Sequence, residues 1–228
     1  SWNEIIAGIS LYRPGPMDYI PTFLRNKRNP SNIGYAIPDI EPIVSETYGV
    51  ITYQEQCMLI VKKIAGYSAS DSDGLRKVIS KKKEDQIAMH KRWFIEGRAL
   101  RSPDEKGRMT TWPTEIPGGL AKGHSRDSLD QLFQQMQDFA KYAFNKSHAA
   151  AYMYISRATA YLKYYYPAHF MAALLNMSSS GADREISITR YITHLRQDLG
   201  IKINTPSINR SNEYFKKKKK NEINFSLY

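Results

Sequence analysis

A group of basic residues near the middle of the chain could hold a polyanion. Arg76 and Lys77 are followed by Lys81, Lys82 and Lys83. On a helix Lys77 and Lys81 share a face, so their like charges repel and mildly destabilise the helix. An anion between them would offset the repulsion, and a triphosphate fits because Lys and Arg donate hydrogen bonds to phosphate oxygens. The alternative is a solvated last turn whose cations are favoured by the helix dipole.

A second group, Asn145-Lys146-Ser147-His148, is expected at the amino end of a long helix capped by Ser147. Free backbone amides and the helix dipole attract anions there, and the lysine and the short polar side chains add donors. The three alanines at 149–151 leave a helix face without bulk, so a base pair could approach it closely. The alternative is an ordinary cap followed by a packing face of small residues.

Three further patterns have weaker chemical interpretations. Tyrosines crowd residues 152–166 beside basic residues and could stack on bases, although we favour packing for most of them. Asp71 and Asp73 have the spacing of a metal-binding pair, but stabilisation by the first turn of a helix is the better explanation. The run Lys216–Lys220 either follows a nucleic-acid backbone or forms a solvated, mobile tip.

The composition favours a globular protein with an anionic partner. Of 228 residues, 33 are Lys or Arg and 22 are Asp or Glu, which gives a formal net charge of +11. This excess indicates nucleic acid, nucleotide phosphates or an acidic membrane, with a basic surface that has no single target as the alternative. The single cysteine excludes an internal disulfide, and the five histidines lack metal-ligand spacing, so no metal site is predicted.

The ends and the hydropathy of the sequence suggest a cellular setting. No apolar run is long enough to span a bilayer, and no signal peptide opens the sequence. The sequence begins at Ser1 without Met and stops at Tyr228. We therefore expect a soluble, cytoplasmic piece of a longer protein with no membrane partner.

The pattern of apolar residues predicts a mainly α fold with several helices. Helical spacing covers 52–66, 70–83, 84–97, 129–143, 147–167, 170–175 and 183–199. Thr52 and Glu55 are expected to form a capping box, and prolines predict a loop-rich N-terminal segment. Glycines and prolines predict a flexible, exposed connection over 98–125. Short β elements are expected near the C-terminus, at 201–203 and 222–228.

Several strings together resemble one protein family in order and rough spacing. They are Ser10-Leu-Tyr-Arg-Pro-Gly-Pro-Met17, Tyr48-Gly-Val-Ile-Thr-Tyr-Gln-Glu-Gln56, Ala65-Gly-Tyr67, Leu75-Arg-Lys77 and Phe144-Asn-Lys-Ser-His-Ala-Ala-Ala-Tyr152. The string that begins at Phe144 is highly specific. Residues 161–174 and 206–215 continue the similarity, which covers nearly the whole chain. The sequence thus resembles the fingers region of the bacterial DNA polymerase III alpha subunit, a family C replicative DNA polymerase.

The resemblance implies template-directed DNA synthesis, in which a primer 3′-hydroxyl attacks the α-phosphate of a deoxynucleoside triphosphate with the help of two metal ions. The implied nucleotide-binding residues are Arg13, Arg76, Lys77, Lys81, Lys82, Asn145, Lys146, Ser147 and His148. Of these, Arg76 and Lys77 would meet the triphosphate, and the turn at 145–148 would lie near the nascent base pair. Lys77 departs from the commoner Arg, which keeps the charge but loses the paired fork of donors.

The resemblance also implies what the chain lacks. The palm aspartates that hold Mg2+ precede this region in the family, so no catalytic residue and no Mg2+ ligand is expected here. The isolated chain is expected to be inactive. Residues 1–177 would form the fingers domain, with 98–125 as a connection atypical of the family. Residues 178–228 would form a linker that enters the helix-hairpin-helix region.

The partners implied by the resemblance are primer-template DNA and deoxynucleoside triphosphates. In the complete enzyme, a sliding clamp, a proofreading exonuclease and a clamp loader would join them. Two alternative functions stay open from the sequence. One is a non-catalytic, basic nucleic-acid-binding module whose lysines grip backbone phosphates. The other is a truncated remnant of a polymerase.

Overall fold

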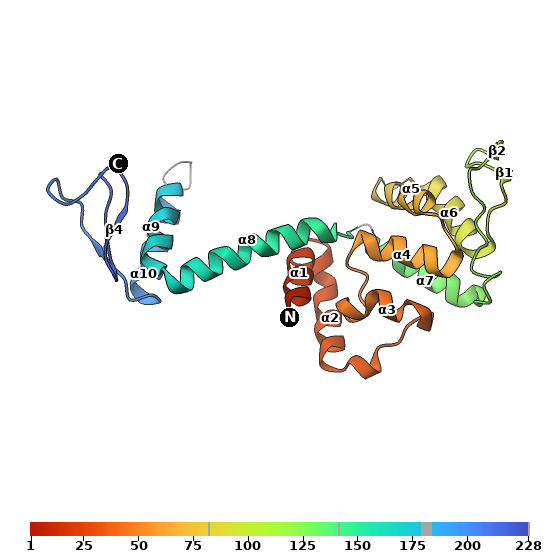
Figure 1. Ribbon diagram of the computed structural model, residues 1–228, viewed down its shortest axis with the longest axis horizontal. Helices are drawn as coiled ribbons and strands as arrows, with labels where there is room; N and C mark the ends of the chain where they lie inside the picture. The colour runs from red at the N-terminus through yellow and green to blue at the C-terminus, as the bar shows by residue number, and fades with distance from the viewer. Residues whose placement is uncertain (82, 141, 179–183, 228) are drawn as a thin grey trace. The chain divides into compact units, whose positions relative to one another are not determined.

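The computed structural model describes residues 1–81, 83–140, 142–178 and 184–227. Its helices are α1 (Trp2–Leu11), α2 (Ile20–Arg28), α3 (Glu41–Val44), α4 (Gln54–Ala65), α5 (Ala69–Ser80), α6 (Glu84–Glu96), α7 (Arg126–Ala140), α8 (Lys146–Tyr165), α9 (Pro167–Met177) and α10 (Arg184–Gln197). Its strands are β1 (Arg101–Pro103), β2 (Met109–Thr111), β3 (Lys202–Asn204), β4 (Lys216–Lys219) and β5 (Glu222–Asn224). The predicted mainly α fold is confirmed (Figure 1). None of the helices in these ranges is long and apolar enough to cross a membrane.

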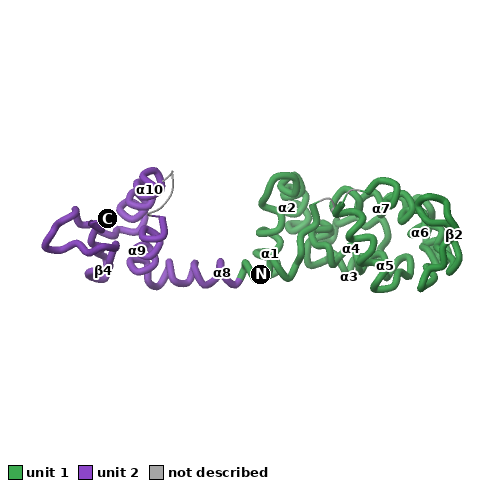
Figure 2. The backbone as a smooth tube through the Cα atoms, turned by 90° about the horizontal axis from the view of Figure 1, so that it is seen from above, with its two compact units in different colours: residues 1–153 green, residues 154–228 purple. Residues whose placement is uncertain are grey.

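Two compact units, residues 1–153 and 154–228, divide the chain within α8 (Figure 2). Each unit has its own cluster of buried apolar side chains. The division lies earlier in the chain than the small polar residues at 178–182, most of which fall outside the described ranges. The assignment of 1–177 to a fingers domain and of 178–228 to a linker follows from the family resemblance and stays a prediction.

The main core of the first unit lies among α4, α5, α6 and α7. The buried side chains that share this core include Ile60, Ile64, Leu75, Ile79, Phe94, Leu132, Phe133 and Met136. They recur at helical spacing in each segment, as the apolar pattern predicts. The rings of Phe94 and Phe133 lie 5.5 Å apart between α6 and α7. This packing fixes α5, which carries Arg76 and Lys77, against its neighbours.

The first fifty residues contain more helix than the sequence predicts, because α1 and α2 both lie there. The prolines fall at helix starts: Pro21 lies in the first turn of α2 and Pro42 in that of α3. Proline is tolerated at such positions because the first amides of a helix have no acceptor within it. One cluster of buried side chains in this part comprises Ala7, Leu11, Phe23 and Val50.

The start of α4 differs from the predicted capping box by one residue. Gln56, not Glu55, reaches back to the chain before the helix. Its Oε1 atom accepts hydrogen bonds from the backbone amides of Thr52 at 2.8 Å and Tyr53 at 3.0 Å. Glu55 is thereby left to contact a different helix, which is described with the site below.

Most residues of the segment 98–125 are exposed, as its glycines and prolines predict, but the segment contains more order than expected. β1 and β2 pair in an antiparallel hairpin. Before the hairpin, Arg98 is buried and its guanidinium contacts two indole rings, 4.7 Å from the centre of Trp93 and 4.6 Å from that of Trp112. The two rings meet edge to face, with centres 4.8 Å apart. A cation beside two aromatic rings keeps favourable contacts even though it has left water.

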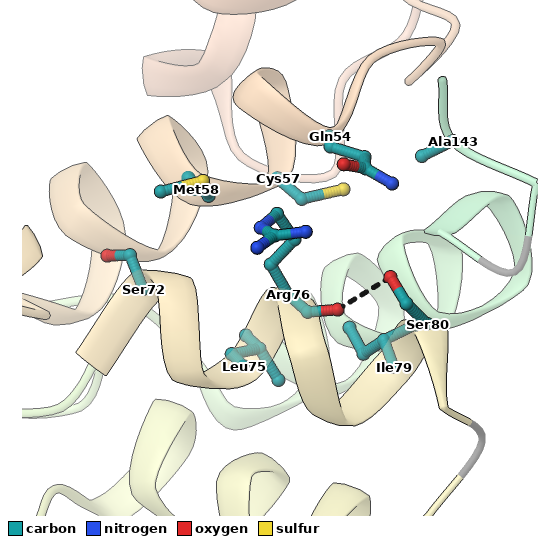
Figure 3. Close-up of a pocket in the computed structure, with 9 residues that line it drawn as sticks. All are labelled: Gln54, Cys57, Met58, Ser72, Leu75, Arg76, Ile79, Ser80 and Ala143. Atoms are coloured by element: carbon teal, nitrogen blue, oxygen red, sulfur yellow. Dashed lines mark hydrogen bonds between the residues drawn. The ribbon is translucent and has the colours of Figure 1, made fainter. Parts of the chain in front are cut away.

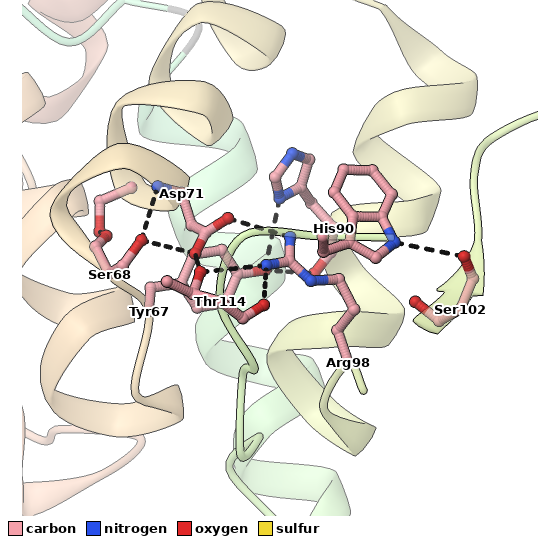
Figure 4. A network of polar contacts seen from close by, with 9 residues as sticks. Tyr67, Ser68, Asp71, His90, Arg98, Ser102 and Thr114 are labelled. Carbon is pink, nitrogen blue, oxygen red and sulfur yellow. Dashed lines mark hydrogen bonds and ion pairs between the residues drawn. The ribbon is translucent and has the colours of Figure 1, made fainter. Parts of the chain in front are cut away.

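The charge of Arg98 is neutralised by Asp71 (Figure 4). The guanidinium donates to Asp71 Oδ1 at 2.9 Å and to the backbone oxygen of Thr114 at 2.6 Å. Asp71 also accepts from the hydroxyls of Ser68 and Thr114, each at 2.6 Å. These bonds join the hairpin segment to the amino end of α5. Asp71 therefore serves an internal ion pair, and the metal-pair spacing with Asp73 has a structural explanation.

The second unit packs α9 and α10 against a small sheet in the strand order β3-β5-β4. β3 runs parallel to β5, whereas β4 is antiparallel to it with an irregularity between Lys217 and Lys219. The buried side chains include Met171, Leu175, Leu195, Ile203, Phe215 and Ile223. The predicted β elements near 201–203 and 222–228 are confirmed as β3 and β5. The lysine run forms β4, which the sequence analysis did not predict.

Gly97 is a position where a side chain would break the fold. Its φ is +92°, and a Cβ atom would lie 2.5 Å from the backbone oxygen of Pro117 and 2.6 Å from that of Ile116. We expect Gly97→Ala to lower the free energy of unfolding by roughly 2 kcal/mol or more, since both strain and overlap oppose it. The control is Gly107→Ala, with φ +75° and open space around the new Cβ, which should cost about 1 kcal/mol. Urea unfolding measures both, and equal costs would contradict the close packing at Gly97.

His90 in α6 is buried beside this network. The hydroxyl of Tyr67 lies 3.4 Å from its Nδ1 atom. Burial and the nearby positive charge of Arg98 lower the pKa of His90 to about 4, against a smaller opposing effect of Asp71. In the unfolded chain the imidazole has an ordinary pKa of about 6.5. As the pH falls, the unfolded state binds the proton first, so protonation favours unfolding.

We therefore expect the free energy of unfolding to fall by roughly 2 to 3 kcal/mol between about pH 6.5 and 4.5. Above this window the contribution of His90 is fully present. Urea unfolding at a series of pH values measures the slope. The His90→Gln variant, which cannot titrate there, should show a much flatter dependence, and the same slope in both proteins would rule out His90 as its source.

Candidate functional site

The basic pair on α5 has an internal carboxylate as its partner. The Arg76 guanidinium donates to Asp73 Oδ1 from Nε at 2.8 Å, and its second terminal nitrogen lies 2.7 Å from the same oxygen. Lys77 Nζ lies 2.7 Å from Asp73 Oδ2. These contacts lower the pKa of Asp73, with the hydrogen bond from Lys77 contributing most. The anion that contacts both of these cations is Asp73, a residue of the same helix.

The lysines after this pair lie outside the last turn of the helix. α5 ends at Ser80, and Ser68 caps its start by accepting a hydrogen bond from the Asp71 amide. Lys81 is the C-cap residue and Lys83 precedes α6. Lys82 lies outside the described residues. The predicted placement of the lysines in the last turn is therefore wrong for Lys81 and Lys83, because the helix ends three residues before position 83.

The amino end of α8 also has an internal anion. Asn145, not Ser147, caps this helix, since its Oδ1 accepts from the His148 amide at 2.8 Å. The carboxylate of Glu55 accepts from the Lys146 amide at 3.1 Å and from Asn145 Nδ2 at 3.0 Å. A carboxylate at this end of a helix is stabilised by free amides and by the dipole. In this structure the anion at the start of α8 is therefore the carboxylate of Glu55.

The side chain of Lys146 points to a second carboxylate. Its Nζ atom lies 2.8 and 2.6 Å from the two oxygens of Glu46. The same ammonium lies 5.5 Å from the centre of the Tyr53 ring. Lys146 therefore fastens the start of α8 to the segment before α4, whereas Ser147 and His148 remain exposed.

Arg13 holds the turn that leads into α8. Its Nε atom donates to the backbone oxygen of Ser10 at 3.0 Å, and its guanidinium also contacts the backbone oxygen of Tyr142. The guanidinium lies 4.6 Å from the centre of the Phe144 ring. Partial burial lowers the pKa of Arg13. The implied nucleotide-binding role of Arg13 stays a prediction, and its observed contacts support the neighbouring turn.

An aromatic ladder continues from this turn along the exposed side of α8. The Phe144 and His148 ring centres lie 5.4 Å apart, and those of His148 and Tyr152 lie 4.7 Å apart. Half of the Tyr152 surface is exposed. The neighbouring Ala149 is fully buried against Ile6 and Tyr53, so the small residues serve packing on one face while the ladder stays open on another.

A small pocket lies between α4 and α5 (Figure 3). Arg76 lines it from α5 and extends toward Cys57 on α4. Gln54 and Ala143 also line it. Ala143 comes two residues before Asn145, and the Gln54 amide donates to the Phe144 oxygen at 3.0 Å. The pocket thus joins Arg76 to the segment that leads into the turn at 145–148, whereas neither Lys77 nor the turn itself lines it.

The sequence analysis missed the internal carboxylates Glu46, Glu55 and Asp73 as partners of the basic residues. Asp73 could have been found, because acidic residues three and four positions before Arg or Lys on a helix form ion pairs. Glu46 and Glu55 carry no such local signal, since their partners lie about ninety or a hundred positions away. Over the described residues, no group of three His, Cys, Asp or Glu side chains could hold a metal ion.

Comparison with known proteins defines the class of this domain. Residues 1–101 match the family described as the bacterial DNA polymerase III alpha subunit finger domain. The DNA polymerase III subunit alpha of Thermus aquaticus is 39% identical over 94% of the chain. That of Halalkalibacterium halodurans is 37% identical over 94%, and that of Aquifex aeolicus is 33% identical over 100%.

The match over residues 1–101 makes this part of the chain a polymerase finger domain. The chain as a whole belongs to the family of bacterial DNA polymerase III alpha subunits, which confirms the resemblance seen in the sequence. It spans between 16% and 18% of the length of these relatives. The family is that of a DNA-directed DNA polymerase.

The cap of α8 can be tested by two substitutions at neighbouring positions. Asn145→Ala removes the hydrogen bonds to the His148 amide and to Glu55, so it should lower the free energy of unfolding by about 1 to 2 kcal/mol. Ser147→Ala changes an exposed first-turn residue and should stay within about 0.5 kcal/mol of the parent. Urea unfolding measures both, and a larger loss for Ser147→Ala would restore Ser147 as the cap.

Proposed function

We propose that the first unit serves as the fingers module of a DNA-directed DNA polymerase and binds the incoming deoxynucleoside triphosphate. Arg76, with Lys77, Lys81 and Lys82, would neutralise the triphosphate, and the turn at 145–148 would face the nascent base pair. Family membership supports this role. The observation that carries it is the pocket shared by Arg76 and the residue Ala143, just before that turn.

The ion pairs of Arg76 and Lys77 suit exchange with a ligand. About a third of the surface of the Arg76 and Asp73 side chains is exposed, and Lys77 is more exposed still. Pairs of this kind contribute about 0.2 to 1 kcal/mol, so opening them costs little. A triphosphate offers several charged oxygens to the same donors, and the planar guanidinium can bind two at once. Asp73 would then keep the cations in place until the nucleotide arrives.

The exposed rings of His148 and Tyr152 would form the surface that contacts the nascent base pair. Aromatic faces stack on bases whatever the base identity, which suits a polymerase that must accept four nucleotides. Asn145 and Lys146 would act indirectly, because their donors already bind Glu55 and Glu46. They would set the position of Ser147 and His148.

The chemistry of bond formation would lie with other residues. In the complete enzyme Mg2+ would be held by palm aspartates outside this sequence. This chain would position the substrate and neutralise its charge, which lowers the barrier without a covalent role. We infer a cytoplasmic enzyme acting on primer-template DNA. A sliding clamp, a proofreading exonuclease and a clamp loader are its proposed partners.

Substitution of Arg76 in a complete alpha subunit that contains this region tests the proposal. Arg76→Ala removes a charged donor pair worth about 1.5 to 3 kcal/mol, so the KM for deoxynucleoside triphosphates should rise roughly ten- to a hundredfold. Steady-state primer extension over a range of nucleotide concentrations measures this change. The affinity for primer-template, measured by fluorescence anisotropy, should change less than about threefold.

Arg25→Ala is the matched control, since it removes the same charge from an exposed position on α2. Its nucleotide dependence should equal that of the parent enzyme. If Arg76→Ala leaves the nucleotide dependence unchanged, or weakens DNA binding as strongly as nucleotide use, the triphosphate role is wrong. The second result would instead favour a basic module that grips nucleic-acid phosphates.

A further inference from the structure

The lysine run of the second unit is a strand with a fixed position. β4 comprises Lys216–Lys219, pairs with β5 and is followed by Lys220 at the turn. Asn176 of α9 anchors its beginning with two hydrogen bonds, donating to the Phe215 oxygen at 3.0 Å and accepting from the Phe215 amide at 2.7 Å. Phe215 is buried in the core of the unit. The lysines are therefore presented by an ordered backbone.

The charges of these lysines are not neutralised by direct ion pairs among the described residues. In the parts of the chain that the structure describes, no ion pair joins any residue of Lys216–Lys220 to a carboxylate. The nearby carboxylate of Glu222 accepts a hydrogen bond from Asn204 at 2.8 Å. That bond, with the charges of Lys218, Lys219 and Lys202, lowers the pKa of Glu222. Five adjacent cations repel one another, and a polyanion would relieve the repulsion.

A cavity of about 250 Å³ lies between this strand and the start of α9. Lys217 and Lys220 line one side of it, and Tyr165, Tyr166 and His169 line the other. More than half of the surface of each tyrosine is exposed, at 59% for Tyr165 and 51% for Tyr166. Large exposed aromatic rings that line a cavity together with lysines form an apolar and cationic surface of the kind that marks a binding site.

We propose that this cavity binds single-stranded nucleic acid. Lys217 and Lys220 would neutralise successive phosphates, and a base would stack on Tyr165 or Tyr166. A positively charged groove combined with aromatic rings is the arrangement that binds single strands without sequence preference. A duplex offers the phosphates but keeps its bases stacked inside. The proposal uses residues 165–221 alone and is independent of the nucleotide site in the first unit.

The test is binding of the 228-residue chain to a fluorescein-labelled thymidine oligonucleotide of about 15 nucleotides, followed by anisotropy. The double substitution Lys217→Gln and Lys220→Gln should weaken binding at least tenfold and reduce the slope of log K against log salt by about 1.4. Lys216→Gln with Lys218→Gln is the matched control. It removes the same charge from the same strand outside the cavity, so its effect should stay below about threefold.

Separate variants test whether bases stack on Tyr165 and Tyr166. Tyr165→Leu with Tyr166→Leu keeps apolar bulk but removes the rings, and it should weaken binding of the oligonucleotide at least fivefold. Tyr154→Leu, at an exposed position earlier in α8 and outside the cavity, should leave binding unchanged. Arg76→Ala should also leave it unchanged, which separates this site from the proposed nucleotide site. Far-ultraviolet circular dichroism verifies the fold of each variant.

Three results would overturn the proposal. The first is an equal loss of affinity in the cavity and control lysine variants, because that pattern describes a diffuse basic surface. The second is full binding by the Tyr165→Leu, Tyr166→Leu variant. The third is equally tight binding of a duplex or of a polyglutamate peptide of the same charge, which would make the site a general polyanion surface. If the Gln variant misfolds, Lys217→Glu alone replaces it, with the same expected loss.

Discussion

The contact between Glu55 and the amino end of α8 is the interaction on which the first unit's site depends. A carboxylate from the first turn of α4 meets the free amides of a helix that begins ninety residues later. Around it, Phe144 pairs with the chain at Tyr53, Arg13 covers the Phe144 ring, and Lys146 reaches Glu46. Each contact is modest by itself. Together they bring four distant parts of the chain to one small region beside the α4–α5 pocket.

The same electrostatics sort the basic residues into two kinds. Lys146 and Arg98 have partners that also build the fold, so removing either partner would disturb the structure. Arg76 and Lys77 share a partner on their own helix, where the ion pair contributes little to packing. A net charge of +11 therefore does not describe an even surface. Part of it holds helices together, and part is available to a ligand.

Sequence patterns predicted the helices well because apolar spacing reflects burial directly, as in α4 to α7. They predicted the caps poorly. Ser147 and Glu55 were plausible partners, but Asn145 and Gln56 have those roles, because several polar residues lie within reach of each helix start and the sequence does not show at which residue the helix begins. The hairpin segment was missed for a related reason. Its order rests on Arg98, two tryptophans and Asp71, which are brought together by folding and leave no periodic trace in the sequence. The basic side of the candidate site was predictable, whereas its internal carboxylates were not.

The position of β4 at the edge of its sheet has a consequence for solubility. An open strand edge presents unpaired amides and carbonyls to which another protein molecule could add a strand. In the order β3-β5-β4, that edge carries consecutive lysines, and the strand is bent by the irregularity between Lys217 and Lys219. A second copy arriving in register would place ammonium groups against ammonium groups. The charge run thus guards the sheet against self-association through its β4 edge, and a change that neutralised it would expose the protein to aggregation there.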